Sequence, residues 1–294
     1  MSKSTPVNGN LIGILGGIIL STDSVFIRLM NIDNSWMIVM LRGLFMWGLV
    51  VVVYLLWPKS RKVLGVPWIT RQNALSTLFF CVASACFVNA LNRGSVATVL
   101  VIISSTPFVS AIISRLFFGT KFDKTLMMAA IAGMLGVAIV MTGRSEGYDP
   151  MANYFALATA VSMALAFIFA SKVEKGTVGL PSLGGVLASA CVIAFTGGSV
   201  LHDVQTLTHY QWLWVAVEGA VIMPLAMGLI SLSTRFVSPV NAGLFLLLET
   251  ALAPLWIYLF LHEAPTLQAI IGGCIIVLAV VSQTWRVKRQ EALA

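Results

Sequence analysis

The sequence predicts an all-α integral membrane protein with ten transmembrane helices, arranged as two inverted five-helix repeats. The first observation is composition: the 294 residues are 59% hydrophobic and only 10% charged, with a mean hydropathy of +0.95. Soluble domains are about 25% charged, so this chain has too few polar side chains to cover a surface in water. The other two observations are a series of long apolar stretches and a repeat between the two halves of the chain.

The apolar stretches match the thickness of a bilayer, whose hydrocarbon core takes about 20 residues of helix to cross. Their length and lack of alternation exclude a transmembrane barrel. The longest break, Pro58 to Gln72, holds 15 residues and is too short for a soluble domain. The ten stretches are Leu11–Met30, Ser35–Trp57, Asn73–Leu91, Ser95–Phe118, Thr125–Thr142, Asn153–Ser171, Ser182–Val200, Tyr210–Leu232, Pro239–Leu261 and Leu267–Trp285.

Basic residues predict the orientation of the spans. If the N-terminus is cytoplasmic, 14 of the 18 Lys and Arg residues fall on the cytoplasmic side, and only Arg28, Arg93 and Arg144 fall outside. Cytoplasmic loops of membrane proteins carry such an excess. We therefore expect a multi-pass protein of the cell inner (plasma) membrane with both termini in the cytoplasm. The net charge of +7 then reflects topology, and we expect no nucleic-acid partner.

The two halves of the chain repeat at an offset of 143 residues. Matched pairs are Asn10 with Asn153, Phe26 with Phe169 and Ser95 with Ser238. The offset divides the chain into a first five-helix repeat over residues 1–146 and a second over 147–294. Because five is odd, the second repeat enters the membrane upside down, an arrangement that transporters use to rock two halves about a central site. Chance similarity between apolar helices is the alternative explanation.

Several of these stretches resemble one known family. The best matches are ALNRGSVATVLVIISSTPFVSAIISRLFFGTKFD from Ala90 and STRFVSPVNAGLFLLLETALAPLWIYLFLHEAPT from Ser233, with LSTDSVFIRL from Leu20 and MLRGLF from Met40. In this order they resemble the drug/metabolite transporter superfamily, in its ten-span EamA-type branch. The resemblance implies a monomeric exporter or exchanger of small metabolites that uses neither ATP nor a cofactor. One departure is Glu249-Thr250, where the family usually has Glu-Pro.

Three carboxylates lie deep within apolar stretches: Asp23, Glu218 and Glu249. An ionised carboxylate facing lipid at a helix centre costs roughly 2.5–3.5 kcal/mol or more, so each must face the bundle interior, pair or stay protonated. We expect Asp23 and Glu249 near the middle of the membrane and Glu218 nearer the outside. They are candidates for a proton or cation site, and structural ion pairs are the alternative.

Further polar and aromatic residues complete the predicted substrate site. Arg42, inside the second span, is expected to pair with Asp23 or to hold a substrate carboxylate, and snorkelling to the interface is the alternative. Ser24 and Ser105 belong to polar runs within helices. Asn89 lies near a span end, where a helix cap is the alternative, and Trp47 is deep enough to stack on a substrate, where packing against lipid is the alternative. The predicted substrate-binding residues are Asp23, Ser24, Arg42, Trp47, Asn89, Ser105, Glu218 and Glu249.

Signatures of enzymes and metal sites are missing from the sequence. It has no HExxH, GxSxG, P-loop or GxGxxG motif, and its four cysteines fall inside apolar stretches without CxxC spacing. We therefore expect a secondary transporter of a small metabolite such as an amino acid or organic cation, without cofactor or metal. It is driven by protons or by the substrate gradient. A membrane-embedded enzyme or lipid-handling protein is the alternative.

Overall fold

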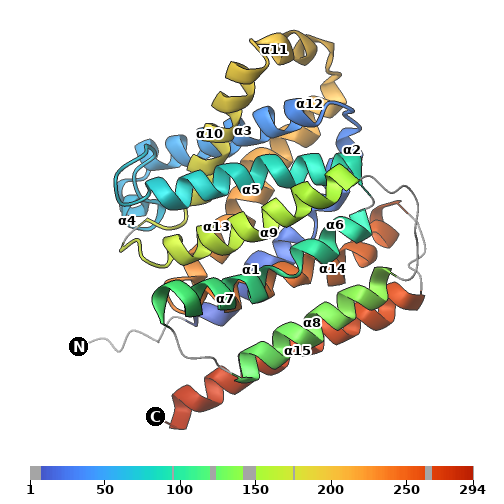
Figure 1. Ribbon diagram of the computed structural model, residues 1–294. Helices are drawn as coiled ribbons and strands as arrows, with labels where there is room; N and C mark the ends of the chain where they lie inside the picture. The colour runs from blue at the N-terminus through green and yellow to red at the C-terminus, as the bar shows by residue number, and fades with distance from the viewer. Residues whose placement is uncertain are drawn as a thin grey trace.

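The computed structural model describes residues 8–94, 96–119, 124–141, 150–174, 176–261 and 267–293, and within these ranges every regular element is a helix (Figure 1). The main helices are α1 (Gly9–Leu20), α2 (Asp23–Met30), α3 (Ser35–Leu56), α5 (Ala74–Arg93), α6 (Val96–Ile103), α7 (Thr106–Phe118), α8 (Lys124–Met141), α9 (Pro150–Ala170), α10 (Leu180–Phe195), α12 (His209–Val217), α13 (Met223–Ser233), α14 (Pro239–Leu261) and α15 (Leu267–Leu293). Shorter elements are α4 (Arg61–Leu64), α11 (Ser199–Asp203), the π-helical turn Glu218–Ile222 and two 3₁₀ turns.

Helix lies in every one of the ten predicted stretches, wherever the structure describes them. Six helical segments are long and apolar enough to cross a membrane, and a bent pair of helices raises this number to seven. The described parts of α7, α8 and α15 contribute only shorter apolar segments. The helical character of the chain is thus as predicted, while the count of ten spans stays a prediction.

Side chains at the helix ends supply hydrogen bonds that the backbone lacks there. The side chain of Asn34 accepts from the backbone N–H groups of Trp36 and Met37 at the start of α3. At the start of α12, Thr208 and Gln211 form a reciprocal capping box. These caps fix where the polar loops turn into apolar helix.

Two of the predicted spans are broken near their middle. The chain leaves α1 at Ser21 and Thr22, whose hydroxyls donate to the carbonyls of Ile18 and Ile19 at 2.6 and 2.8 Å. The break between α6 and α7 uses the same chemistry. Hydroxyl groups there donate to carbonyls three residues earlier, at 2.6 Å from Ser105 to Ile102 and from Thr106 to Ile103. Backbone groups released by a break inside apolar surroundings need such partners.

Two other predicted spans contain irregular helix. The stretch Ser182–Val200 bends by 103° between α10 and the segment Ser199–Thr206. Gly197 and Gly198 make this bend with φ of 58° and 81°, a conformation that glycine adopts without strain. The stretch Tyr210–Leu232 contains the π-helical turn, which lies just before Pro224.

The two halves of the chain pack against each other throughout the bundle. Helix α5 packs against α9, α3 against α10, α1 against α13, and α8 against α15. Figure 1 shows α5 beside α9 and α8 beside α15. At the crossing of α3 and α10, Gly43 lies so close to Gly185 that a side chain on Gly43 would meet the Gly185 carbonyl. Each of these pairs joins one helix of the first half to one of the second.

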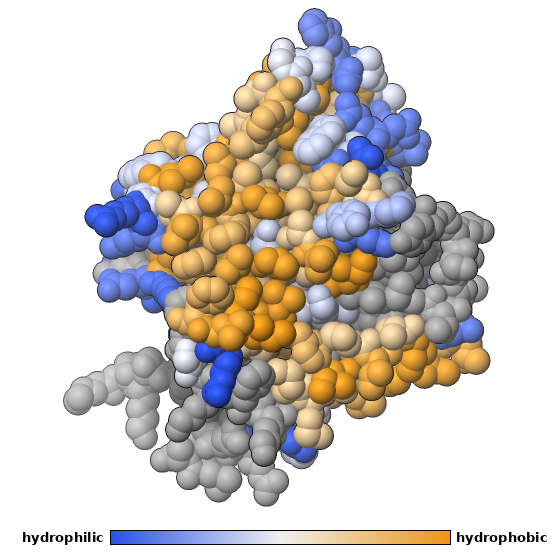
Figure 2. Space-filling view, in the orientation of Figure 1, coloured by the Kyte–Doolittle hydropathy of each residue, from blue (hydrophilic) through white to orange (hydrophobic). Residues whose placement is uncertain are grey.

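The flank of the bundle is apolar and its ends are polar. Figure 2 shows hydrophobic side chains over the long sides of the helices and hydrophilic ones gathered at the two ends. Exposed residues on the flank include Leu78, Leu116, Leu157 and Leu225. This distribution suits a protein whose surroundings are lipid along the flank and water at the ends.

Candidate functional site

A cluster of three charged side chains lies buried inside the bundle. Arg42 Nη2 lies 3.2 Å from Asp23 Oδ2, and Arg42 Nε lies 3.1 Å from Glu218 Oε1. The three residues are 4%, 0% and 0% exposed. Arg42 therefore does not snorkel to the interface, and its predicted pairing with Asp23 is confirmed, with Glu218 as a second partner.

The irregular parts of two spans position the two carboxylates. Asp23 is the first residue of α2, directly after the helix break, where the N-terminal end of a helix favours negative charge. Glu218 begins the π-helical turn between α12 and α13, a type of irregularity that is frequent at functional sites. Arg42 reaches both from the continuous helix α3. The break and the turn thus place both carboxylates around one guanidinium.

Arg42 also contacts uncharged side chains. Its Nη2 donates to the Sδ of Met223 at 2.7 Å, and its guanidinium carbon lies 5.7 Å from the centre of the Phe87 ring. Arg42 Nη1, Asp23 Oδ1 and Glu218 Oε2 have no hydrogen-bond partner among the described residues. The cluster therefore contains buried hydrogen-bond donors and acceptors without partners among these residues. Burying such groups without partners costs free energy.

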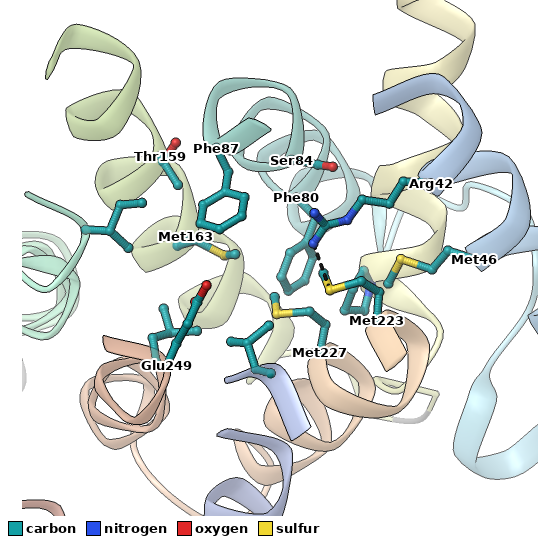
Figure 3. A pocket seen from close by; sticks show the side chains of 14 residues that line it. Arg42, Met46, Phe80, Ser84, Phe87, Thr159, Met163, Met223, Met227 and Glu249 are labelled. Carbon is teal, nitrogen blue, oxygen red and sulfur yellow. Dashed lines mark hydrogen bonds between the residues drawn. The ribbon is translucent and has the colours of Figure 1, made fainter. Parts of the chain in front are cut away.

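A cavity lies between the two halves of the chain beside this cluster. Figure 3 shows Arg42 and Glu249 on opposite sides of it, with methionine side chains between them. The cavity has a volume of about 40 Å³, which gives room for about three water molecules. The lining residues are Leu20, Arg42, Met46, Phe80, Ser84, Phe87, Ile103, Thr159, Met163, Pro181, Met223, Met227, Leu246 and Glu249.

Glu249 is the second charged group of the cavity wall. It lies on α14, is 4% exposed, and its Oε1 has no hydrogen-bond partner among the described residues. Apart from Ser84 and Thr159, the rest of the wall is apolar. The site therefore presents a guanidinium and a carboxyl group across a small hydrophobic space.

The structure brings four of the eight predicted site residues together: Arg42 and Glu249 line the cavity, and Asp23 and Glu218 hold Arg42. The break and the π-helical turn bring the carboxylates of Asp23 and Glu218 to the same guanidinium, and the expected depth of Glu218 nearer the outside stays a prediction.

Three other predicted residues lie away from this cavity. The indole of Trp47 donates to the carbonyl of Pro67 at 2.9 Å, so its polar atom is held by a loop. Asn89 is buried and accepts from the hydroxyl of Ser35 at 3.0 Å. Ser105 bonds within its own helix break. None of the three lines the cavity. The side chain of Ser24 is outside the part of the chain that the structure describes.

The apolar wall of the cavity was not predicted from the sequence. Met46, Met163, Met223 and Met227 all line the cavity, from helices α3, α9 and α13. The chain has 13 methionines, and in an apolar stretch a methionine facing a cavity has the same pattern as one facing lipid. Only the spacing of Met223 and Met227, four residues apart on one helix face, could have indicated a shared surface.

A family model and individual relatives both match this chain, and they indicate the same type of protein. The model of the EamA-like transporter family matches twice, over residues 7–142 and 150–284. An uncharacterized transporter of Archaeoglobus fulgidus is 25% identical over 279 residues, which cover 93% of this chain and 94% of the relative. An uncharacterized transporter of Synechocystis is 22% identical over 235 residues, covering 76% of this chain and 67% of the relative.

A third relative and a solved structure extend the comparison. The uncharacterized transporter YdfC of Bacillus subtilis is 25% identical over 182 residues, covering 60% of this chain and 58% of the relative. A crystal structure, titled only as that of a protein, superposes with a TM-score of 0.75 over 98% of this chain and 100% of its own, at 16% identity. At that identity the superposition shows the fold alone.

The family and these three relatives are named as transporters and not as enzymes. The family model covers most of the chain, and the apolar helices are those of a multi-pass membrane protein. The chain therefore belongs to the EamA-like transporter family and is a membrane transporter.

Proposed function

We propose that this transporter exports or exchanges a small metabolite that carries an amino group, such as an amino acid or an organic cation. A transporter of this family works in a lipid bilayer on a small-molecule substrate. The observation that carries the proposal is the cavity between the two halves, with Arg42 on one side and Glu249 on the other. Its otherwise apolar wall favours a substrate that is compact and partly hydrophobic.

The charge of the site supports a cationic group on the substrate. Two buried carboxylates, Asp23 and Glu218, contact the Arg42 guanidinium, and a third, Glu249, lies across the cavity from it. Buried carboxylates without a counter-ion take up a proton or bind a cation. An ammonium group on the substrate and a proton would therefore compete for Glu249. If substrate binding releases the proton from Glu249, transport is coupled to protons. If a second substrate molecule displaces the first, the same site exchanges substrates.

A substrate carboxylate would compete for Arg42. The guanidinium already holds Asp23 and Glu218, and its Nη1 is the atom with no partner among the described residues. A substrate carboxylate that accepts a charge-assisted hydrogen bond from Nη1 would orient the substrate with its amine toward Glu249, across the cavity. In this proposal Asp23 and Glu218 hold Arg42 in place, while Glu249 contacts the substrate.

The repeats provide a mechanism of alternating access. We take residues 1–146 and 147–294 as two inverted five-helix units that rock about the cavity. The repeat relates α3 to α10, α8 to α15, α5 to α13 and α1 to α9. A twofold rotation that exchanges the two halves would therefore leave the packed pairs α3–α10 and α8–α15 unchanged and would carry the packed pair α5–α9 onto the packed pair α13–α1. This exchange supports a twofold relation between the units. On this topology both termini lie in the cytoplasm of the inner membrane, and a single chain holds the complete site.

Contacts at both ends of the bundle fit an occluded state. At one end the side-chain amide of Asn34 donates to Asp203 at 3.0 Å, between α3 and α11. At the other end the N–H of Gly179 donates to the carbonyl of Leu64 at 2.9 Å. Both bonds join the two halves. With a cavity of about 40 Å³ between them, substrate entry requires one of these ends to open.

Transport by purified protein in liposomes tests the proposal. Counterflow of labelled amino acids, polyamines and quaternary amines would be measured for the parent chain and for Glu249→Gln. We expect at least one substrate class to exchange and Glu249→Gln to abolish that exchange. Glu174→Gln is the matched control, because Glu174 is an exposed carboxylate outside the cavity. Full exchange by Glu249→Gln, for the substrate that the parent chain transports, would contradict the proposed role.

A further inference from the structure

A second cavity lies at one end of the bundle, away from the buried charge cluster. It is formed by the loop between α3 and α5 and the loop between α9 and α10. Its volume is about 640 Å³, against about 40 Å³ for the central cavity. The lining residues are Tyr54, Arg61, Lys62, Gly65, Val66, Thr70, Arg71, Gln72, Asn73, Val173, Gly176 and Leu180.

The charged side chains that line this cavity are all cationic. Arg61, Lys62 and Arg71 line it, and no carboxylate is among its lining residues. Lys62 and Arg71 have no ion-pair partner among the residues that the structure describes. Three cationic side chains around one concave space form a site for an anion with several oxygen atoms, such as a phosphate.

The loops that form the cavity are held in place by their own hydrogen bonds. Asn73 accepts from the N–H of Thr70 at 2.7 Å and donates to the carbonyl of Trp68 at 3.2 Å. Arg61 Nε donates to the carbonyl of Tyr54 at 3.0 Å, and its guanidinium lies 4.8 Å from the centre of the Tyr54 ring. A ligand therefore meets a site that is largely formed before binding, which lowers the entropic cost of binding.

Exposed apolar residues lie next to the lining residues in the sequence of the loop between α3 and α5, and at the end of α3. Leu56, Trp57 and Trp68 are 79%, 65% and 55% exposed, and Val63 and Ile69 are also exposed. Tryptophans at such positions are typical of the boundary between the headgroups and the hydrocarbon of a bilayer. Figure 2 shows the hydrophilic patch at the left end of the molecule, where Figure 1 places α4, directly beside the hydrophobic flank. A ligand with a phosphate and acyl chains would meet both surfaces at once.

We propose that this cavity binds the phosphate headgroup of an anionic phospholipid. The cations around the space bind the phosphodiester, and the exposed apolar residues of the same loop contact the acyl chains. Basic pockets at the membrane surface between transmembrane helices bind anionic headgroups in this way. A free phosphate would use the cations alone and would leave the apolar surroundings without a role. The proposal does not depend on which substrate the central cavity transports.

Lipid binding by purified protein in detergent micelles tests this site. Native mass spectrometry would count and titrate bound phosphatidylglycerol, with phosphatidylcholine as the neutral lipid. We expect the double variant Lys62→Gln with Arg71→Gln to bind phosphatidylglycerol about thirtyfold more weakly, since each basic residue near the surface contributes about 1 kcal/mol. The matched control is Lys59→Gln with Arg235→Gln, which removes two exposed cations that do not line the cavity. It is expected to bind like the parent chain.

Three results would overturn the proposal. Equal binding of phosphatidylcholine would show that the headgroup charge is not recognised. An equal loss of affinity in the control variant would show a general effect of surface charge. Displacement of phosphatidylglycerol by inorganic phosphate at the same concentration would assign the cavity to a soluble anion. Thermal unfolding of both variants without lipid shows that any loss of binding comes from a folded protein.

Discussion

Replacing Arg42 by methionine tests the energetics of the buried charge cluster. The change keeps a long apolar side chain and removes the guanidinium that lies 3.2 Å from Asp23 and 3.1 Å from Glu218. At an effective dielectric constant of about 20, two unit charges at this distance attract by about 5 kcal/mol. Most of that attraction offsets the cost of burying the charges. Breaking a buried pair costs about 3–5 kcal/mol, because it leaves the partner uncompensated.

We therefore expect Arg42→Met to lower the free energy of unfolding by about 3–5 kcal/mol. The assay is reversible unfolding in mixed detergent micelles, followed by circular dichroism. Adding Asp23→Asn and Glu218→Gln to the same chain removes the stranded carboxylates, and this triple variant should regain most of the loss. A loss below about 1 kcal/mol for Arg42→Met, the size of an exposed pair, would refute the reasoning. So would a triple variant no more stable than Arg42→Met.

The same assay checks two further features of the packing. Gly43→Ala should lower the free energy of unfolding by about 1–3 kcal/mol, because its new methyl group meets the carbonyl of Gly185, while Gly48→Ala, with open space around it, should change it little. Equal losses for the two glycines would contradict this account of the helix crossing. Trp256→Phe removes a hydrogen bond of 2.7 Å to the hydroxyl of Ser21 and should cost about 1 kcal/mol, and an unchanged stability would show that this bond does not hold the helix break.

The charged part of the site could be predicted from the sequence because charge is so rare in the apolar stretches. Asp23, Glu218 and Glu249 stand out there, and the expected pairing of Asp23 with Arg42 is present. The contact of Glu218 with Arg42 could not be predicted from position along the sequence, because it depends on a helix break and a π-helical turn. Hydropathy carries no signal that tells such a turn from regular helix.

The apolar part of the site and the course of one span could not be predicted. A methionine such as Met163 is as hydrophobic on the wall of a cavity as on a surface facing lipid, so its direction depends on tertiary packing. The bend after α10 depends on Gly197 and Gly198, and glycine is also common in straight transmembrane helices. Trp47 was placed in the site by its depth alone, and the loop carbonyl of Pro67 that it bonds lies 20 residues away in sequence.

Thiol labelling of the cavity tests alternating access most directly. Ser84 lines the cavity, and Ser84→Cys, in a chain whose four natural cysteines are replaced by alanine, places one reactive group there. A membrane-impermeant maleimide would be added to vesicles of either orientation. The account predicts labelling of Ser84→Cys from both sides of the membrane, while Ser60→Cys, in a loop at one end of the bundle, reacts from one side only. Labelling of Ser84→Cys from a single side would contradict the account.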